Sequence, residues 1–195
     1  MGKTIYKNTL LFVFLFSSGL IFGQKNFNLD LNSASLNIDG NKLIGFNTTF
    51  DFNREEVRKG WWKYARKFGN PIDMRTYYVV TIPAESTDGN VDLTIYSQAL
   101  DDTDPVVFSI GISDKKYKVQ IEELLKEFKK DFYIQFYLNE LKLKETEATG
   151  LSERYERALQ DEKNEVLDLL QANKESIESL KEEIRKVEKV LSQKP

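Results

Sequence analysis

Few side chains in this sequence have the types and spacing that enzyme chemistry usually needs. The chain contains no histidine and no cysteine, so it lacks the commonest general base, the thiolate nucleophile and the usual ligands of zinc, copper and haem iron. Glu55 and Glu56 could form an acid–base pair, but acidic residues also stabilise the first turn of a helix. No nucleotide-binding loop, serine-hydrolase elbow or metal motif occurs. We therefore expect no cofactor, no metal site and no catalytic residue.

A cluster of three aspartates, Asp101, Asp102 and Asp104, resembles a set of calcium ligands. An EF-hand loop also needs a central glycine and a closing glutamate, and neither follows here. We interpret the cluster as a polar turn. An enzyme that uses carboxylates alone, such as a glycosidase, is the third functional hypothesis, and it would need two acids about 5–10 Å apart in a cleft.

Two adjacent tryptophans, Trp61 and Trp62, are the most conspicuous aromatic feature. Neighbouring residues on a helix point about 100° apart, so only one of them can face the centre of a core. Trp61 shares a helical stripe with Val57, which predicts a core position, and Trp62 is expected at its edge. Together with Phe132 and Phe136 they define an alternative, a pocket for a small apolar molecule or a glycan between a sheet and an aromatic helix.

The first 23 residues have the layout of a secretory signal peptide. Two lysines precede an apolar run, Leu10–Phe16, and Gly23 supplies the small residue before a cleavage expected at Gln24. The apolar stretch of about fourteen residues is shorter than the ~20 that cross a bilayer, and an uncleaved anchor is the alternative. We predict export to the periplasm or the medium, with no transmembrane anchor after signal cleavage.

Residues 33–115 are predicted to form an α+β domain, preceded by a polar lead-in at 24–32 with no assigned element. The elements run strand, strand, helix, strand, strand, strand. Short polar turns between strands favour an antiparallel sheet, with the helix at 54–68 covering one face. The last strands are expected at 72–83, 91–96 and 106–112.

Three local signals support this order. Asp39-Gly40 between alternating runs is a strong hairpin signal. Asn53 followed three residues later by Glu56 forms a capping box at the start of the helix. Gly69 is expected to end that helix in a left-handed conformation.

Residues 116–193 are predicted to be helical, because apolar residues recur there at alternating gaps of three and four. The part from Phe132 to Leu143 also alternates like a strand, but its Glu- and Lys-rich context favours helix. Asn173 interrupts the seam, and a lone polar seam residue commonly fixes register or partner number. The predicted helix-pairing seam comprises Val166, Leu170, Asn173, Ile177, Leu180, Ile184, Val187 and Leu191.

Thr149-Gly150 is the one break signal inside this region, at 149–151. The seam keeps nearly the same phase across it, which favours one long, kinked helix that forms a coiled coil. An antiparallel helical hairpin that turns at 149–151 is the alternative.

The end of the leader, Ile21-Phe22-Gly23-Gln24, looks like that of Bacteroidota envelope proteins. The segment Leu124-Leu125-Lys126-Glu127-Phe128, which feeds a Glu- and Lys-rich tail, is similar to a group of secreted proteins of that phylum without assigned function. Thr149-Gly150 departs from the uninterrupted tail of that group. The resemblance implies a compartment and no catalytic residue.

The charge balance argues against nucleic acid as a partner. The chain has 28 Lys and Arg against 31 Asp and Glu, interspersed along the sequence, so it offers no basic field for a phosphate backbone. We expect an exported, non-enzymatic envelope protein that acts through its helices, or structurally, as a homodimer or with a helical protein partner. The small-ligand or glycan binder remains the alternative.

Overall fold

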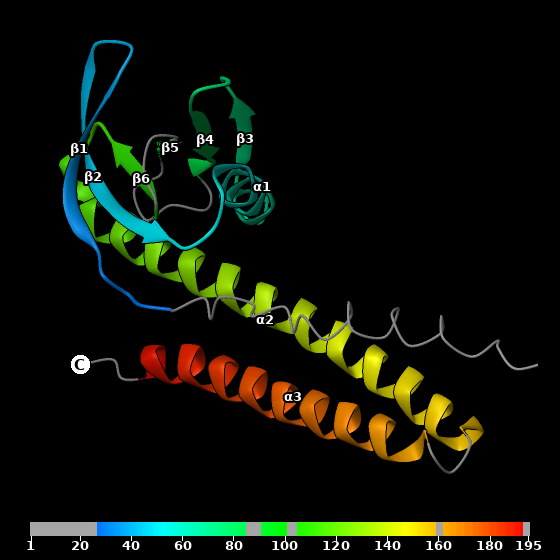
Figure 1. The fold of residues 1–195 in the computed structure, drawn as a ribbon. Helices are drawn as coiled ribbons and strands as arrows, with labels where there is room; N and C mark the ends of the chain where they lie inside the picture. Colours follow the sequence, from blue (N-terminus) through cyan, green and yellow to red (C-terminus); the bar gives the residue numbers. More distant parts are fainter. Residues whose placement is uncertain (1–26, 85–90, 101–104, 159–161, 193–195) are drawn as a thin grey trace, which may run out of the picture.

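The computed structural model describes residues 27–84, 91–100, 105–158 and 162–192, which form an antiparallel sheet and three α-helices (Figure 1). This architecture confirms the predicted α+β class. The predicted signal peptide at 1–23 lies outside the described residues, as do Asp101, Asp102 and Asp104.

The sheet has six strands in the order β1-β2-β6-β5-β4-β3, and every neighbouring pair is antiparallel. One more strand is present than predicted, because the segment expected as a single strand at 72–83 reverses direction. Arg75 adopts a φ of 72°, and its amide donates to Asp73 Oδ1 over 2.7 Å, which is the chemistry of an Asx turn. The strands are β1 (Asn32–Ile38), β2 (Asn41–Phe50), β3 (Asn70–Asp73), β4 (Tyr78–Ile82), β5 (Leu93–Ala99) and β6 (Val106–Ile112).

The turn predicted at Asp39-Gly40 is confirmed. Both residues have positive φ, 50° and 79°, as the tight turn between twisted strands requires. Strand β1 begins at Asn32, so the end of the lead-in is part of the sheet.

Two glycines face each other between β2 and β6. Gly45 of β2 pairs with Gly111 of β6, and a Cβ on Gly45 would overlap the carbonyl oxygen of Ile110. Only glycine permits this approach of two backbones. Strand β2 curves strongly at the sheet margin (Figure 1), and Leu36 and Leu43 form a second apolar cluster with Tyr96 on the face away from the helices.

Helix α1 (Arg54–Ala65) begins with the predicted capping box. Glu56 N donates to Asn53 Oδ1 over 2.9 Å, and Asn53 N donates to Glu56 Oε2 over 3.2 Å. The prediction of a left-handed cap at Gly69 is wrong, because Gly69 does not have positive φ. A Cβ there would lie 2.7 Å from the carbonyl oxygen of Thr81, so glycine serves close packing on β4.

The main core lies between one face of the sheet and the helices α1 and α2 (Lys118–Arg157). Trp61 of α1 lies 5.3 Å from Phe108 of β6 and 5.1 Å from Phe128 of α2, measured between ring centroids. Phe50 of β2 joins them at 5.5 Å from Phe128. A short 3-10 turn, η2 (Lys115–Tyr117), precedes α2 and is capped by Asp114.

The C-terminal region is an antiparallel hairpin of α2 and α3 (Lys163–Ser192), so the favoured long helix is wrong and the hairpin alternative is correct. Helix α2 ends at Arg157 and α3 begins at Lys163, so the chain reverses direction after Arg157 rather than at 149–151, and Ala158 is in an extended conformation. Thr149 and Ser152 lie within α2, and each hydroxyl donates to the carbonyl four residues earlier, over 3.0 Å. The segment 132–143 is helical, as favoured.

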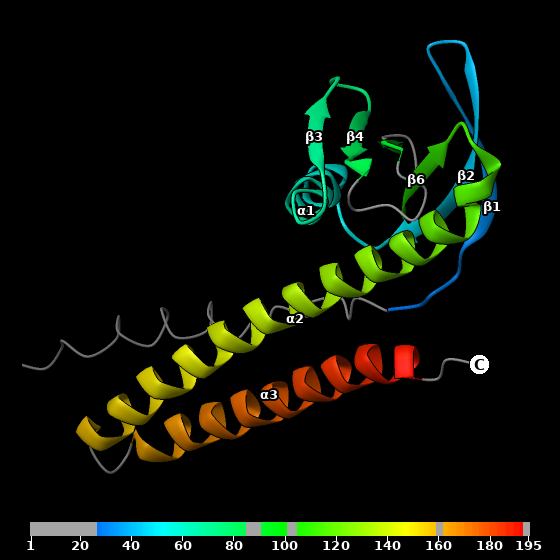
Figure 2. The ribbon, with the colours of Figure 1, turned by 180° about the vertical axis from the view of Figure 1, so that it is seen from behind.

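Both ribbon views show α2 leaving the sheet and α3 returning alongside it (Figures 1 and 2). The end of the hairpin near the turn therefore has no sheet beside it. This arrangement divides the hairpin into a part near the sheet and a distal part.

Candidate functional site

The predicted seam faces α2, but its burial is uneven. Val166 and Val187 are fully buried, Asn173 is 5 % exposed, and the side chain of Leu191 lies outside the described residues. The remaining members are half-buried: Leu170, Ile177, Leu180 and Ile184. Half-buried residues on α2 repeat at matching spacing: Leu141, Lys144, Ala148, Leu151 and Tyr155.

The two parts of the hairpin differ in what covers them. Near the sheet, Val187 belongs to the main core with Tyr133 and Tyr137, and Leu180 and Ile184 pack against that core. The distal part has only two helices, and several of its leucines are exposed to solvent: Leu143 (64 %), Leu167 (46 %) and Leu169 (43 %). A two-helix pair cannot cover apolar side chains on all sides.

Asn173 is buried in the seam with both polar atoms of its side chain unpartnered among the described residues. A buried amide without hydrogen bonds costs roughly 1–3 kcal/mol. The side chain therefore destabilises the hairpin, as expected for a polar residue that sets register or partner number.

The two tryptophans have the different positions expected of them. Trp61 is fully buried, while Trp62 is half-buried with its ring 5.7 Å from the ring of Tyr78. The guanidinium of Arg58 lies 4.4 Å from the same tyrosine ring and bonds Asp73 Oδ1 over 2.9 Å. Trp62 thus packs against the tyrosine whose ring lies beside Arg58, and Arg58 forms the ion pair with Asp73 that joins α1 to β3.

Phe132 and Phe136 contact other rings rather than Trp62. Phe132 lies 4.8 Å and Phe136 4.9 Å from the ring of Phe52, and a Cβ on Gly60 would overlap the Phe132 ring. The four residues expected to line a ligand pocket are therefore packed within the aromatic core or at its edge.

A buried lysine is the feature that sequence reasoning missed. Lys129 is 1 % exposed, and its Nζ donates to Asn28 Oδ1 and to Thr48 Oγ1, each over 2.8 Å. Burial lowers the pKa of Lys129 to about 8, and the carboxylates of Asp30 and Asp51 offset part of this effect. The one sequence signal for the burial of Lys129 is its position four residues after Leu125, on the apolar stripe of α2.

The lead-in before β1 packs over this lysine. Phe27 lies edge-on to Tyr133 at 5.3 Å, Leu31 packs against the main core, and the Thr48 hydroxyl donates to the carbonyl of Asp30 over 2.8 Å. Residues 27–31 are thus held to α2 and β2 by contacts that lie far apart in the sequence.

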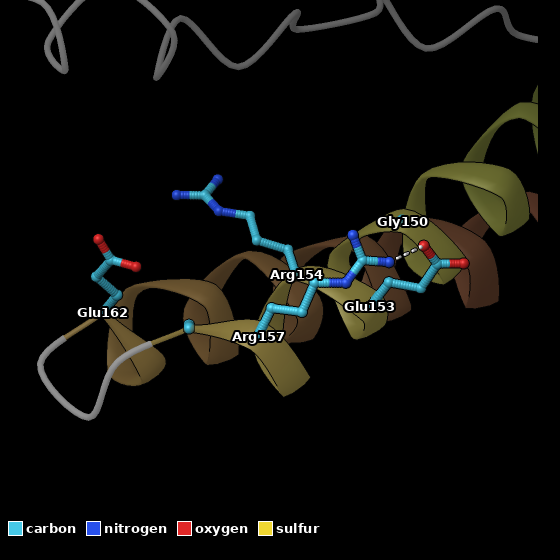
Figure 3. Close-up of a pocket in the computed structure, with 6 residues that line it drawn as sticks. Gly150, Glu153, Arg154, Arg157 and Glu162 are labelled. Carbon is cyan, nitrogen blue, oxygen red and sulfur yellow. Dashed lines mark hydrogen bonds and ion pairs between the residues drawn. The ribbon is translucent and has the colours of Figure 1, made fainter.

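An open pocket of about 280 Å³ lies at the tip of the hairpin (Figure 3). Arg157 donates to Glu153 over 3.2 Å, and charges of both signs line the pocket: Glu153, Arg154, Arg157 and Glu162, with Gly150 and Ala158. These side chains are exposed, and the arrangement favours no particular ligand.

No family model, curated protein or solved structure matches this chain in comparison with known proteins. Among the described residues, no helix is both long and apolar enough to cross a membrane. The described part of the chain also holds no cluster of three acidic side chains placed to bind a metal ion.

Proposed function

We propose that this is an exported, non-enzymatic protein that binds an amphipathic helix of a partner protein on the distal part of its α2–α3 hairpin. The observation that carries the proposal is that the apolar seam residues of the distal part are only partly buried between the two helices. Leu170 and Ile177 are half-buried although they face α2, and Leu169 lies exposed on one flank of the seam. A third helix would cover these side chains, as helices do when an apolar stripe docks into a groove between two others.

Asn173 supports a selective contact of this kind. Its amide weakens the hairpin seam where an apolar residue would strengthen it, and such a residue discriminates among helix arrangements. The partner segment is therefore a helix with apolar residues three and four positions apart.

The export part of the proposal rests on the sequence. The leader-like residues 1–23 and the resemblance to secreted Bacteroidota proteins support the periplasm or the medium. The absence of histidine and cysteine throughout the chain supports a non-enzymatic role, because most common catalytic groups are missing.

The small-ligand alternative has weaker support. A pocket between sheet and aromatic helix would need space beside Trp61 and Phe128, but Phe50 and Phe108 occupy it at ring-centroid distances of 5.2–5.5 Å. Of the four residues predicted to line this pocket, Trp62, Phe132 and Phe136 are half-buried and Trp61 is buried.

Site-specific photocrosslinking in the producing cells tests the proposal. A photoreactive phenylalanine analogue at Leu143 or Leu169 should give one discrete protein adduct, and the same analogue at exposed Val119, at the sheet end of α2, should not. Leu143→Glu should remove the adduct from the Leu169 position without changing the circular dichroism spectrum. Adducts of equal yield at Val119, or none at the hairpin positions, would refute helix binding.

A further inference from the structure

The two edges of the sheet differ sharply. Edge strand β3 has four residues and contains Pro71, which lacks an amide hydrogen and so cannot donate to an added strand. Edge strand β1 has seven residues, Asn32–Ile38, without a proline or a charged residue. Proteins commonly protect edge strands with proline, charge or short length, and β1 has none of these features.

The ladder between β1 and β2 shows which backbone groups of β1 face outward. The two-residue turn makes Ile38 and Asn41 a hydrogen-bonded pair, and such pairs alternate along an antiparallel ladder. Ser33, Ser35 and Asn37 therefore direct their N–H and C=O groups away from β2. Their side chains are exposed, and β1 forms the outer margin of the sheet in both ribbon views (Figures 1 and 2).

We propose that β1 pairs with β1 of a second copy of this chain, antiparallel about a two-fold axis at Ser35. In this register Ser35 faces its own copy and Ser33 faces Asn37, so all outward groups of these three residues are satisfied at once by hydrogen-bonded pairs. No like charges meet, because the strand carries none. Self-complementarity favours a second copy over an unrelated strand.

The side chains agree with this register. Ala34 faces Leu36 of the second copy, on the face that carries the apolar cluster of Leu36, Ile38 and Leu43. The cluster would therefore continue from one copy into the other. Serines at the axis are small and allow the strands to approach. Pro71 at the other edge stops further growth, so the assembly closes as a dimer.

The proposed pairing of β1 does not depend on helix binding by the α2–α3 hairpin. Variants at Ser35 test the pairing of β1 without changing the hairpin. Ser35→Pro removes the two central hydrogen bonds of the dimer but no backbone hydrogen bond to β2, because the Ser35 amide faces outward. It also removes the Ser35 hydroxyl, which donates to the Leu43 carbonyl of β2. We expect it to weaken self-association at least tenfold in sedimentation equilibrium of the purified chain. Ser35→Lys places like charges opposite each other and should act in the same direction.

Matched controls exclude a general loss of structure. Ser35→Ala loses only the hydroxyl that donates to the Leu43 carbonyl over 3.2 Å and should still dimerise. Ser113→Lys adds the same charge at an exposed site off the edge and should dimerise as well. Dimerisation should also vary little with salt concentration, because the strand is uncharged.

Crosslinking tests the register, because the chain has no cysteine of its own. With a short bismaleimide, Ser35→Cys should crosslink to itself, and Ser33→Cys should crosslink to Asn37→Cys in a mixture but not to itself. A monomer at all concentrations, a dimer unchanged by Ser35→Pro, or self-crosslinking at Ser33 would overturn the proposal. So would binding of an extended peptide to a monomeric chain. A dimer lost through Leu143→Glu instead would assign self-association to the hairpin.

Discussion

The ammonium group of Lys129 lies 2.8 Å from the hydroxyl oxygen of Thr48, a residue 81 positions earlier in the chain. The lysine is almost fully buried, and it also donates to Asn28, which belongs to the lead-in. A polar contact thus ties α2, β2 and the lead-in together inside an otherwise aromatic core. A buried cation is costly, so this contact makes the stability of the protein depend on pH.

The direction of that dependence follows from the pKa. Burial lowers the pKa of Lys129 to about 8 in the folded state, against about 10.4 in the unfolded chain. Below pH 8 the lysine is charged in both states, and burial of the charge destabilises the fold. Between pH 8 and 10.4 the unfolded chain binds more protons, so the free energy of unfolding rises with pH, by about 3 kcal/mol in total.

Comparison with Lys129→Met isolates this effect, because other titrating groups are shared. Urea unfolding at pH 7, 8, 9 and 10 should show the native chain gaining stability relative to the variant as pH rises. If the free energies of unfolding of the native chain and of Lys129→Met instead change with pH in parallel, Lys129 keeps an ordinary pKa.

Removal of the buried amide of Asn173 should stabilise the hairpin. Asn173→Leu eliminates two unpartnered polar atoms and adds apolar contact, so the free energy of unfolding should rise by about 1–2 kcal/mol. Gln171→Leu on the exposed side of α3 is the control and should change stability little. If the amide sets partner selectivity, Asn173→Leu should also broaden the range of photocrosslinked adducts. A loss of stability in Asn173→Leu would show that the amide has a partner in solution.

The adjacent tryptophans should differ in their contribution to stability. Trp61 is fully buried among Phe108 and Phe128, so Trp61→Ala should cost about 3–5 kcal/mol. Trp62 is half-buried against Tyr78, and Trp62→Ala should cost less than half of that amount. Thermal unfolding followed by circular dichroism measures both. Equal losses would contradict the assignment of Trp61 to the core and Trp62 to its edge.

Local chemistry made part of this fold predictable. Asp39-Gly40, the Asn53–Glu56 capping box and the Trp61 stripe each depend on residues close in sequence. The division of β3 from β4 was not predictable in this way, because the turn depends on positive φ at Arg75, a residue type that rarely adopts it.

The features that the sequence did not reveal depend on distant contacts. The sequence around Lys129 is that of an ordinary exposed helical lysine. Its burial depends on Asn28 and Thr48, which are distant in the sequence and which the fold places beside it. Outward-facing groups of β1 become apparent only when the strand order places β1 at an edge. The turn between α2 and α3 was misplaced because Gly150, a residue that weakens helices in general, is tolerated within α2.

Two helical glycines should respond in opposite directions to substitution with alanine. A Cβ on Gly150 has nothing within 4 Å, so Gly150→Ala should stabilise the protein by about 0.5–1 kcal/mol through helix propensity. A Cβ on Gly60 overlaps the Phe132 ring, and Gly60→Ala should destabilise by about 1–3 kcal/mol because the ring must move in a packed core. Urea unfolding of the two variants measures both changes. A destabilised Gly150→Ala would place the turn of the hairpin at 149–151, since alanine cannot readily replace glycine where φ is positive, whereas a gain places Gly150 inside a continuous α2.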